Sequence, residues 1–397
     1  MHRLLDYAES ERAFLLDTLE ALVRAESPST DKAAVDRCGA TLARQLTALG
    51  AAVERLPQDE RGDHVRAGFK GEGRPILLLG HIDTVWAVGQ IGRMPFREED
   101  GRLHGPGIFD MKAGIAAAML AVRTLDTIGG SRPSITMLFT TDEEIGSGTS
   151  RAIIEAEARR SRAVLVLEPS LPGGGVKTSR KGCGDFELVV RGVSAHAGIA
   201  PGSGANAVLE LARQIVALEA LQDPERGVSV NVTVVAGGER TNVIPDIARA
   251  SIDVRVPTMA DARRIEQRIR SLSTSVPGTS LEVRGGVGRP PLERTAGIVK
   301  LYELARSCAR QLGRELSEGG TGGGSDGNFA AALGVPTLDG LGPDGDGAHA
   351  LHEHVVLADL PWRAAFLACL LSRIAHGGGP VSENGAKAGW TSSREVE

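Results

Sequence analysis

Short runs of apolar residues alternate with helical patterns in the N-terminal part of the chain. The runs are residues 76–79, 135–139 and 164–167. They are too short for helices, and continuous apolar runs of this length are typical of strands buried on both faces of a parallel sheet. Around them, the spacing of apolar residues predicts helices over residues 5–24, 35–49 and 112–125. This alternation predicts an α/β domain with a mixed, mostly parallel sheet flanked by helices.

A different order of elements begins near Gly182. The pattern predicts strands over residues 186–190, 228–235, 248–256 and 281–283, and helices over residues 206–221 and 260–272. The order β-α-β-β-α-β is that of a ferredoxin-like α+β unit. We therefore expect a main domain of residues 1–181 and 297–376, an inserted domain of residues 182–296, and a disordered tail of residues 377–397 that has little to bury.

The composition excludes several classes of protein. With 42% hydrophobic and 24% charged residues and a net charge of −5, the chain resembles an ordinary soluble globular protein. A mildly acidic chain has no general attraction to nucleic acid or anionic membranes, so neither is an expected partner. The four scattered cysteines argue against a disulfide framework. Because the N-terminal segment carries acidic residues throughout, unlike a secretory signal, we expect a cytoplasmic location.

The first buried run ends at a histidine and an aspartate. His81 and Asp83 are two positions apart, and on an extended chain such side chains point to the same side. In open α/β sheets, ligands bind beyond the carboxyl ends of the strands. A metal-binding histidine usually gives its other ring N–H to a carboxylate, a carbonyl or water, and Asp83 is placed for that role.

Carboxylates also follow the other two runs. Asp142, Glu143 and Glu144 come after the second run and Glu168 after the third, while Asp110 stands in a tight loop before the alanine-rich helix. A charged helix face would repeat every three to four residues and would show no preference for strand ends. Acids beside buried strands are costly unless a cation compensates them, so the sequence favours a metal site.

Three histidines near the C-terminus are candidates for a further metal ligand. They are His349, His352 and His354, in the segment GDGAHALHEHVVL. The residues alone indicate that one of them completes the site and leave open which one.

Eight short blocks occur in order across nearly the whole chain: GHIDTV, GPGIFDMKAG, TTDEEIGS, LEPS, GVSAHAG, TNVIPDIARASIDVRVP, TGGGSDGNFAA and GAHALHE. One such block is weak evidence, whereas eight in order are specific. Together they resemble the dinuclear zinc metallopeptidases of the aminoacylase and glutamate carboxypeptidase (carboxypeptidase G) type. The resemblance implies a catalytic domain with an inserted lid or dimerisation domain.

The resemblance also implies a role for each residue of the strand-end cluster. The implied ligands of two Zn²⁺ per subunit, with Co²⁺ or Mn²⁺ as possible substitutes, are His81, Asp110, Glu144, Glu168 and His349. Asp110 bridges the two metals, from a loop with a cis peptide after the aspartate. His349 is selected by alignment on Glu353, with His352 where the family usually has Asn or Asp. Glu143 is the general base, and Asp83 orients His81.

A second set of implied roles concerns the substrate. His196 of the inserted domain, often from the partner subunit, stabilises the oxyanion. The implied substrate contacts are Arg255, Asn242, Arg289, Lys177 and Thr321. Arg255 and Asn242 bind a free carboxylate, which suits an arginine fork, and Arg289 and Lys177 add contacts for an acidic side chain. Thr321 opens a glycine-rich loop whose N–H groups are able to cradle an anion, although such a loop is also consistent with a simple turn.

The resemblance and the residues together predict a hydrolase. We expect it to cleave the amide bond of N-acyl amino acids or short peptides and to release a C-terminal amino acid, with glutamate as the first choice. An aminoacylase or N-acyl-amino-acid deacetylase would use the same centre. A catalytically silent metal-binding regulator is the alternative of another class, and the presence of Glu143 beside a full ligand set argues against it. We expect a homodimer through the inserted domain.

Overall fold

The computed structural model describes residues 2–128 and 132–375. The tail for which the sequence predicts disorder, residues 377–397, lies outside this part of the chain. Within it there are two compact units. The first comprises residues 2–128, 132–179, 294–320 and 325–375, and the second comprises residues 180–293 and 321–324. The segment 321–324, which the sequence analysis assigned to the main domain, groups with the second unit.

The first unit is built on a six-stranded sheet of order β1-β2-β6-β3-β7-β16. Its strands are β1 (Ala52–Leu56), β2 (His64–Phe69), β3 (Glu72–His81), β6 (Pro133–Thr140), β7 (Ala163–Val166) and β16 (Thr337–Leu338). Strands β6, β3, β7 and β16 run parallel, whereas β1 and β2 are antiparallel additions at one edge. The expected mixed, mostly parallel α/β sheet is confirmed.

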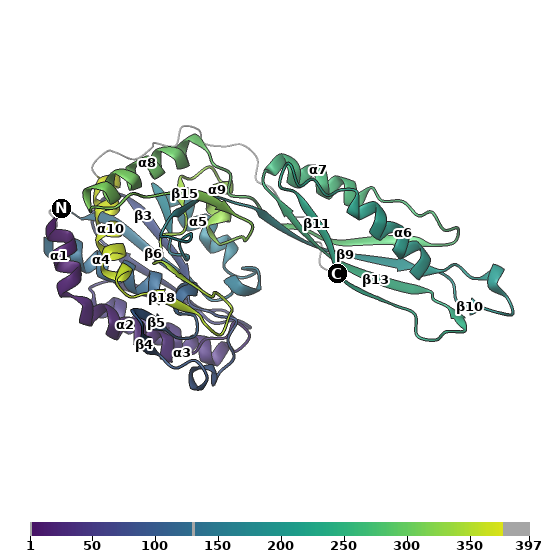
Figure 1. Cartoon of the computed structure of the whole chain (residues 1–397), viewed down its shortest axis with the longest axis horizontal. Helices are drawn as coiled ribbons and strands as arrows, with labels where there is room; N and C mark the ends of the chain where they lie inside the picture. Colours follow the sequence, from purple (N-terminus) through teal and green to yellow (C-terminus); the bar gives the residue numbers. More distant parts are fainter. Residues whose placement is uncertain (1, 129–131, 376–397) are drawn as a thin grey trace. The chain divides into compact units, whose positions relative to one another are not determined.

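Helices cover both faces of this sheet, which explains the continuous apolar runs. Along β3, Ile76 and Leu78 pack into one core, and Leu77 and Leu79 pack into another. The first core includes α4 (Ala113–Ile128), α8 (Ala296–Gln311) and α10 (Asp359–Arg373), together with the N-terminal helices; the second includes α5 (Arg151–Arg160) and α9 (Gly327–Ala332). Figure 1 shows α4 and α10 on one side of β3 and β6, and α5 and α9 on the other.

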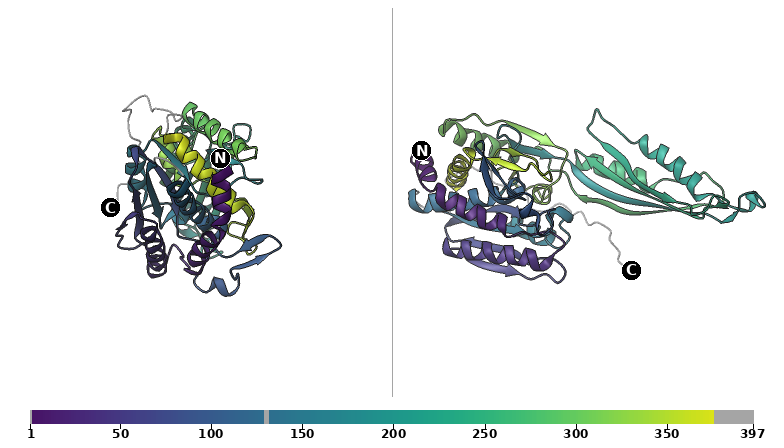
Figure 2. Two further views of the ribbon diagram at one scale, coloured as in Figure 1. Left: turned by 90° about the vertical axis from the view of Figure 1, so that its left-hand side faces the viewer. Right: turned by 60° about the horizontal axis from the view of Figure 1, so that its bottom comes forward.

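The predicted helix over residues 5–24 is two helices in the structure. α1 (His2–Ser10) and α2 (Arg12–Arg24) are separated at Glu11. The Ser10 hydroxyl donates to the Tyr7 carbonyl at 2.7 Å, and a hydroxyl that bonds a backbone carbonyl in this way favours a helix end. The next helix, α3 (Lys32–Ala48), is capped by the Asp31 side chain. In Figure 2 the purple α1 lies beside the yellow α10, and both contribute to the first core.

The second unit has a four-stranded antiparallel sheet of order β11-β13-β9-β14. Its elements are β9 (Gly182–Arg191), α6 (Ala207–Glu219), β11 (Ser229–Gly237), β13 (Ile247–Val256), α7 (Met259–Arg270) and β14 (Ser280–Arg289). Both helices pack on the same core with alternate residues of the strands. They begin at the caps Asn206 and Thr258, whose side chains accept backbone N–H groups. The ferredoxin-like order of elements is confirmed.

The remaining strands of the described residues form smaller sheets. Their strands are β4 (Arg97–Glu99), β5 (Arg102–His104), β8 (Val176–Arg180), β10 (Ala195–His196), β12 (Val243–Ile244), β15 (Glu318–Thr321), β17 (Gly345–Asp346) and β18 (His354–Val356). They pair as β17-β18-β5-β4, β15-β8 and β10-β12. The loop between β17 and β18 carries His349.

Within the described ranges, no helix has both the length and the apolar character needed to cross a bilayer. None of the four cysteines forms a disulfide in the described structure, and three of them are buried, as expected for small apolar residues. Cys183 differs, because it is half-buried and accepts a hydrogen bond from Arg255 at 2.6 Å.

Candidate metal centre

Three adjacent parallel strands bring side chains together at the edge of the central sheet that their carboxyl ends form. β3 ends at His81, which lies opposite Thr140, the last residue of β6. Glu143 and Glu144 follow shortly after Thr140, and Glu168 stands two residues beyond the end of β7. Because parallel strands point the same way, their carboxyl ends meet at this edge.

Close packing brings the Asp110 loop to the same edge. A Cβ atom on Gly114, in the first turn of α4, would lie 2.1 Å from the carbonyl oxygen of Leu167, so this approach requires glycine. Gly80 likewise leaves room for Met111, whose Cε would lie 2.9 Å from a Cβ there. The Asp110–Met111 peptide is cis, as the resemblance implies.

The buried carboxylate of Glu353 holds the Asp110 loop in place. It accepts the Trp86 indole N–H at 2.8 Å and three backbone N–H groups, those of Gly107 (2.9 Å), Phe109 (2.9 Å) and Asp110 (3.2 Å). Burial raises the pKa of Glu353, and these donors oppose that effect. Glu353 follows His349 by four positions, so one loop carries both a predicted ligand and the anchor of the Asp110 loop.

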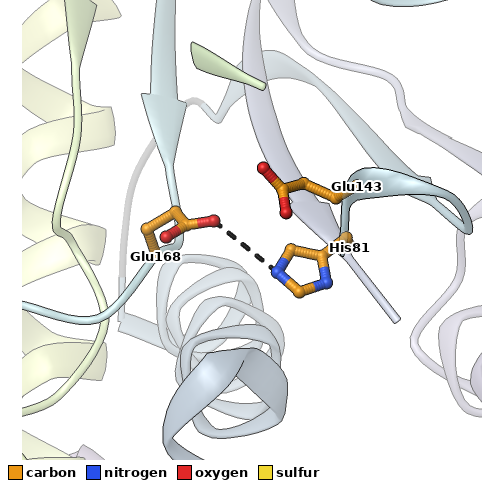
Figure 3. A group of neighbouring side chains, drawn as sticks. All are labelled: His81, Glu143 and Glu168. Carbon is orange, nitrogen blue, oxygen red and sulfur yellow. Dashed lines mark ion pairs between the residues drawn. The ribbon is translucent and has the colours of Figure 1, made fainter. Parts of the chain in front are cut away.

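The imidazole of His81 is buried and faces two carboxylates. Its Nδ1 donates to the backbone carbonyl of Asp83 at 3.0 Å, which places the lone pair of the neutral ring on Nε2. Nε2 lies 3.2 Å from Asp110 Oδ1 and 3.6 Å from Glu168 Oε1. Figure 3 shows Glu168 and Glu143 beside this ring. Burial lowers the pKa of His81, but the neighbouring carboxylates raise it by more, to well above its ordinary value.

Asp83, the predicted partner of His81, contacts the ring more closely with its backbone carbonyl than with its carboxylate. Asp83 Oδ1 lies 3.5 Å from His81 Nδ1. The carboxylate accepts the Ser29 hydroxyl at 2.7 Å and the backbone N–H groups of Glu143 and Glu144 at 3.3 Å each. Burial raises the pKa of Asp83, and its partners lower it below the ordinary value. Asp83 thus stays ionised and also fixes the backbone of the two glutamates.

His349 is the C-terminal histidine that reaches the cluster. Its Nε2 lies 3.1 Å from Glu144 Oε2 and 3.4 Å from Asp110 Oδ2, and half of its side chain is exposed. His352 lies elsewhere, with Nε2 3.8 Å from Asp346, and His354 donates to the His352 carbonyl. Among the described residues, the geometry therefore favours His349 for the place that the sequence left open.

The donor set fits divalent metal ions. Among the residues that the structure describes, two groups of side chains have ligand atoms within 4.8 Å of one another. They are His81 with Glu143 and Glu168, and His81 with Asp110 and Glu144. Imidazole nitrogens and carboxylate oxygens without a thiolate suit Zn²⁺, and Co²⁺ or Mn²⁺ also accept them. A bound cation would compensate the charge of the acids that gather at the ends of these buried strands.

The electrostatics of the cluster indicate a binding site for positive charge. Hydrogen bonds to Asp110 and Glu144 raise the pKa of His349 to about 10. Burial raises the pKa of Asp110, but His349 and His81 lower it far below the ordinary value. Burial dominates at Glu144 and raises its pKa. Since the carboxylates stabilise the protonated form of a neighbouring imidazole so strongly, they attract a metal cation by the same field.

Two of the predicted substrate residues lie together in the second unit. β10, which contains His196, pairs with β12, and the N–H of Ala197 donates to the Asn242 carbonyl at 2.9 Å. The N–H groups of Gly198 and Ile199 donate to His196 Nδ1. These bonds place the proton of the neutral ring on Nε2, where the exposed imidazole acts as a donor.

The two predicted arginines lie on the four-stranded sheet of the second unit, far from β10 and β12. Arg255 on β13 and Arg289 on β14 both stand opposite Cys183 on β9. The Arg255 guanidinium makes a two-point contact with Asp253, at 3.1 and 2.7 Å, and this hydrogen bonding raises its pKa. Arg289 is buried. Arg255 lies eight residues along β13 from the end near His196, about 27 Å at the usual rise of a strand, so one chain does not bring Asn242 and Arg255 together.

The last two predicted residues lie on β8 and β15. The backbone of Lys177 exchanges hydrogen bonds with Asp339, and its side chain is buried. The carbonyl of Thr321 accepts the N–H of Lys181. In the glycine-rich loop, the Gly323 and Ser325 N–H groups donate to side chains of the protein itself, which favours a structured turn over an anion cradle at these two positions.

Sequence reasoning missed several buried polar residues around the cluster. Ser29 contacts the Asp83 carboxylate, and Asp326 accepts the hydroxyls of Thr140 (2.8 Å) and Ser147 (2.5 Å). Asp326 directly follows the TGGGS segment, and that position was its one available signal. Ser29 stands alone in a polar segment, and no pattern distinguishes it.

Comparisons with known proteins agree with the geometry. The family model described as "Peptidase family M20/M25/M40" matches residues 77–373. The chain is 32% identical to carboxypeptidase G2 of Pseudomonas sp. (strain RS-16) over 381 residues, which cover 93% of this chain and 91% of that protein. It is also 32% identical to the succinyl-diaminopimelate desuccinylase of Acidovorax ebreus over 371 residues, which cover 86% and 93%.

Solved structures show the same fold. An M20 family metallo-carboxypeptidase from Sulfolobus solfataricus has a TM-score of 0.72 at 18% identity, with 91% of this chain and 99% of that chain covered. A dinuclear metal-binding M20 peptidase from Bacillus subtilis has a TM-score of 0.67 at 18% identity, with 93% and 99% covered. The chain therefore belongs to the M20/M25/M40 peptidase family and is a hydrolase of amide bonds.

Proposed function

We propose that this chain is a two-metal hydrolase that cleaves the amide bond between an acyl or aminoacyl group and a C-terminal amino acid, with glutamate as the preferred leaving residue. One observation carries the proposal: His81, Asp110, Glu144, Glu168 and His349 converge on one sheet edge with Glu143 beside them. The identity to a carboxypeptidase supports the release of a C-terminal amino acid, and the identity to desuccinylases supports an N-acyl substrate.

Five side chains would hold the metals. His81, Asp110, Glu144, Glu168 and His349 supply imidazole and carboxylate donors, and Asp110 lies between the two histidines. When bound, a pair of divalent ions supplies Lewis acidity, which polarises a carbonyl and makes water more acidic. Zn²⁺ is our first choice because the site combines nitrogen and oxygen ligands.

Glu143 is the proposed general base. It lies beside His81 and Glu168, and Asp83 fixes its backbone N–H. From there its carboxylate takes a proton from the attacking water and returns it to the leaving amine. In our proposal, His196 donates through Nε2–H to the developing oxyanion, and Arg255 of the second unit binds the free carboxylate.

We propose a homodimer in which each chain completes the other's site. His196 and Asn242 lie at the small β10-β12 sheet of the second unit, and Arg255 and Arg289 lie at the far end of its four-stranded sheet. β11 is an edge strand. The exposed large apolar side chains on β11 and α6 are Val208, Leu209, Val216, Val234 and Val235. An apolar edge strand beside an apolar helix is suited to symmetric pairing.

A hydrolysis screen tests the proposed reaction. The substrates are N-benzoyl and N-succinyl derivatives of glutamate, alanine and lysine, dipeptides that end in the same three residues, and a carboxyl-amidated glutamate derivative. Each is incubated with protein loaded with Zn²⁺, Co²⁺ or Mn²⁺, and with protein treated with chelator. We expect release of the C-terminal amino acid, fastest for glutamate, little turnover of the amidated substrate, and none with chelator. Metal binding without hydrolysis of any substrate would favour the silent regulator. We also propose a cytoplasmic location, which is supported by four cysteines that form no disulfide in the described structure. Cell fractionation tests it.

A further inference from the structure

The loop that carries Glu143 and Glu144 is a tight turn between β6 and α5. It contains two left-handed backbone positions, Gly146 (φ 97°) and Ser147 (φ 58°). A loop of this kind does not hold its shape by regular backbone pairing alone, so the residues that pin its ends determine where both glutamates point.

Asp142 holds the loop in place by accepting hydrogen bonds from within it. Its Oδ2 accepts the N–H of Thr149 at 2.6 Å, the Thr149 hydroxyl at 2.7 Å and the N–H of Ser150 at 3.3 Å. Its carbonyl accepts the N–H of Ser147 at 2.7 Å. Asp142 is 1% exposed, and its Oδ1 has no hydrogen-bond partner among the described residues. Burying a carboxylate in this way is costly, which indicates that the loop depends on it.

His64, on the neighbouring strand β2, contacts both ends of the loop. This fully buried histidine begins β2, and its Nδ1 lies 3.0 Å from Thr141 Oγ1 while its Nε2 lies 3.2 Å from Thr149 Oγ1. Thr141 precedes Asp142 directly, and Thr149 is close to the start of α5. The two ring nitrogens therefore contact the two ends of the loop.

The protonation of the ring matches these contacts. The Thr149 hydroxyl donates to Asp142, so its oxygen accepts a proton from His64 Nε2–H. In a neutral ring Nδ1 is then an acceptor, facing the Thr141 hydroxyl, whose proton it shares with the Gly62 carbonyl. Burial lowers the pKa of His64, with opposing contributions from Asp142, Asp83 and Asp63, and this is consistent with a neutral ring.

We propose that His64 is a positioning residue, which ties Thr141 to Thr149 and Asp142 and thereby fixes the direction of Glu143 and Glu144. The inference rests on the proposed roles of the two glutamates. In the described structure, the hydrogen bonds of His64 go to Thr141 and Thr149 and to none of the five proposed metal ligands, so His64 acts through the loop.

Four variants test this role. His64→Leu removes both polar contacts of the ring, and His64→Gln restores a hydrogen-bond donor near the position of Nε2. Thr149→Val removes one hydroxyl that the ring contacts, and Thr47→Val is the control. Thr47 is exposed on α3 and its hydroxyl makes one hydrogen bond, to Ala43. For His64→Leu we expect kcat to fall on the order of 10-fold to 100-fold, since a misplacement of about 1 Å can cost that much. KM should stay within about twofold of wild type, and the fall in kcat should exceed any loss of bound metal. Thr149→Val should lower kcat in the same direction, His64→Gln should recover most of it, and Thr47→Val should match wild type.

Amide hydrogen exchange of the peptide spanning residues 141–150 provides a readout independent of turnover. We expect faster exchange in His64→Leu and Thr149→Val and unchanged exchange in Thr47→Val. If kcat falls only in proportion to lost metal or lost folded protein, or if exchange is unchanged, the positioning role is wrong. If wild type hydrolyses no substrate, the proposed function fails, and the exchange experiment still decides whether His64 holds the loop.

Discussion

The Nε2 atom of His349 lies 3.1 Å from the Glu144 carboxylate, although 205 positions separate these two residues along the chain. Asp110, from a third segment, lies 3.4 Å from the same nitrogen. The cluster is thus assembled by the fold from the ends of several elements. Each member is open to a separate test.

Glu143 is expected to be essential for turnover and dispensable for metal binding. Glu143→Ala removes the proton acceptor while leaving the five proposed ligands, so kcat should fall on the order of 10²-fold to 10⁴-fold. Kinetics and metal analysis on the same preparation measure both effects. Glu303→Gln, an exposed glutamate of α8, is the matched control. Hydrolysis that survives in Glu143→Ala would contradict the mechanism.

His349 and His352 are expected to behave differently on substitution. His349→Ala removes a nitrogen beside Asp110 and Glu144, so this variant should bind fewer metal ions or bind them more weakly, and it should lose activity. His352→Ala should bind two ions like wild type, because His352 lies beside Asp346. Equilibrium dialysis followed by metal analysis compares them. Equal losses in the two variants would overturn the assignment of His349.

Mixed dimers are expected to recover activity that neither parent variant has. If His196 acts in the partner's site, a dimer of one Glu143→Ala chain and one His196→Ala chain has one site with both residues intact. Co-expression with two different tags, purification of the mixed dimer and kinetics measure this, with about half the wild-type kcat per dimer expected. A chain that sediments as a monomer while active, or a mixed dimer without activity, would refute the shared site.

Asp359 is expected to make stability depend on acid pH. Burial raises the pKa of Asp359, but Arg363, the N–H of Asp344 and Arg314 lower it below the ordinary value. A depressed carboxyl pKa stabilises the fold above the unfolded-state value of about 3.9, and this stabilisation disappears as the pH falls through the folded-state pKa.

Asp359→Asn should therefore destabilise the chain near neutral pH by about 3–5 kcal/mol, since Arg363 stays buried without its carboxylate partner. Chemical unfolding monitored by circular dichroism at several pH values measures the difference from wild type, which should shrink below about pH 4. Asp17→Asn, at an exposed position of α2, is the control. A difference that stays constant down to pH 2 would contradict the ionic role of Asp359.

The central strands were predictable because their sequence differs from that of any surface element. Residues 76–79 are apolar without interruption, and the structure buries alternate side chains on opposite faces of the sheet. The two antiparallel strands β1 and β2 were not predicted, because Ala52–Leu56 and His64–Phe69 mix polar and apolar residues over short lengths. The break between α1 and α2 was also missed, since it depends on one local hydrogen bond of Ser10.

The candidate site, like the fold, was predictable in part from the sequence. Strand-end placement indicated His81, Glu144 and Glu168, whereas the selection of His349 needed either the family resemblance or the fold. His64 had no signal in the sequence, because one histidine at the start of a mixed strand is not distinguishable from a surface residue. Its role depends on Thr141 and Thr149, which only the tertiary structure brings to the two sides of its ring.

The four hydrogen bonds that Glu353 receives have a consequence for loading the enzyme with metal. They shape the Asp110 loop with donors from the protein alone, so the entropy of ordering that loop is lost during folding. Incoming ions meet a preorganised receptor, and more of their intrinsic binding free energy is retained as affinity.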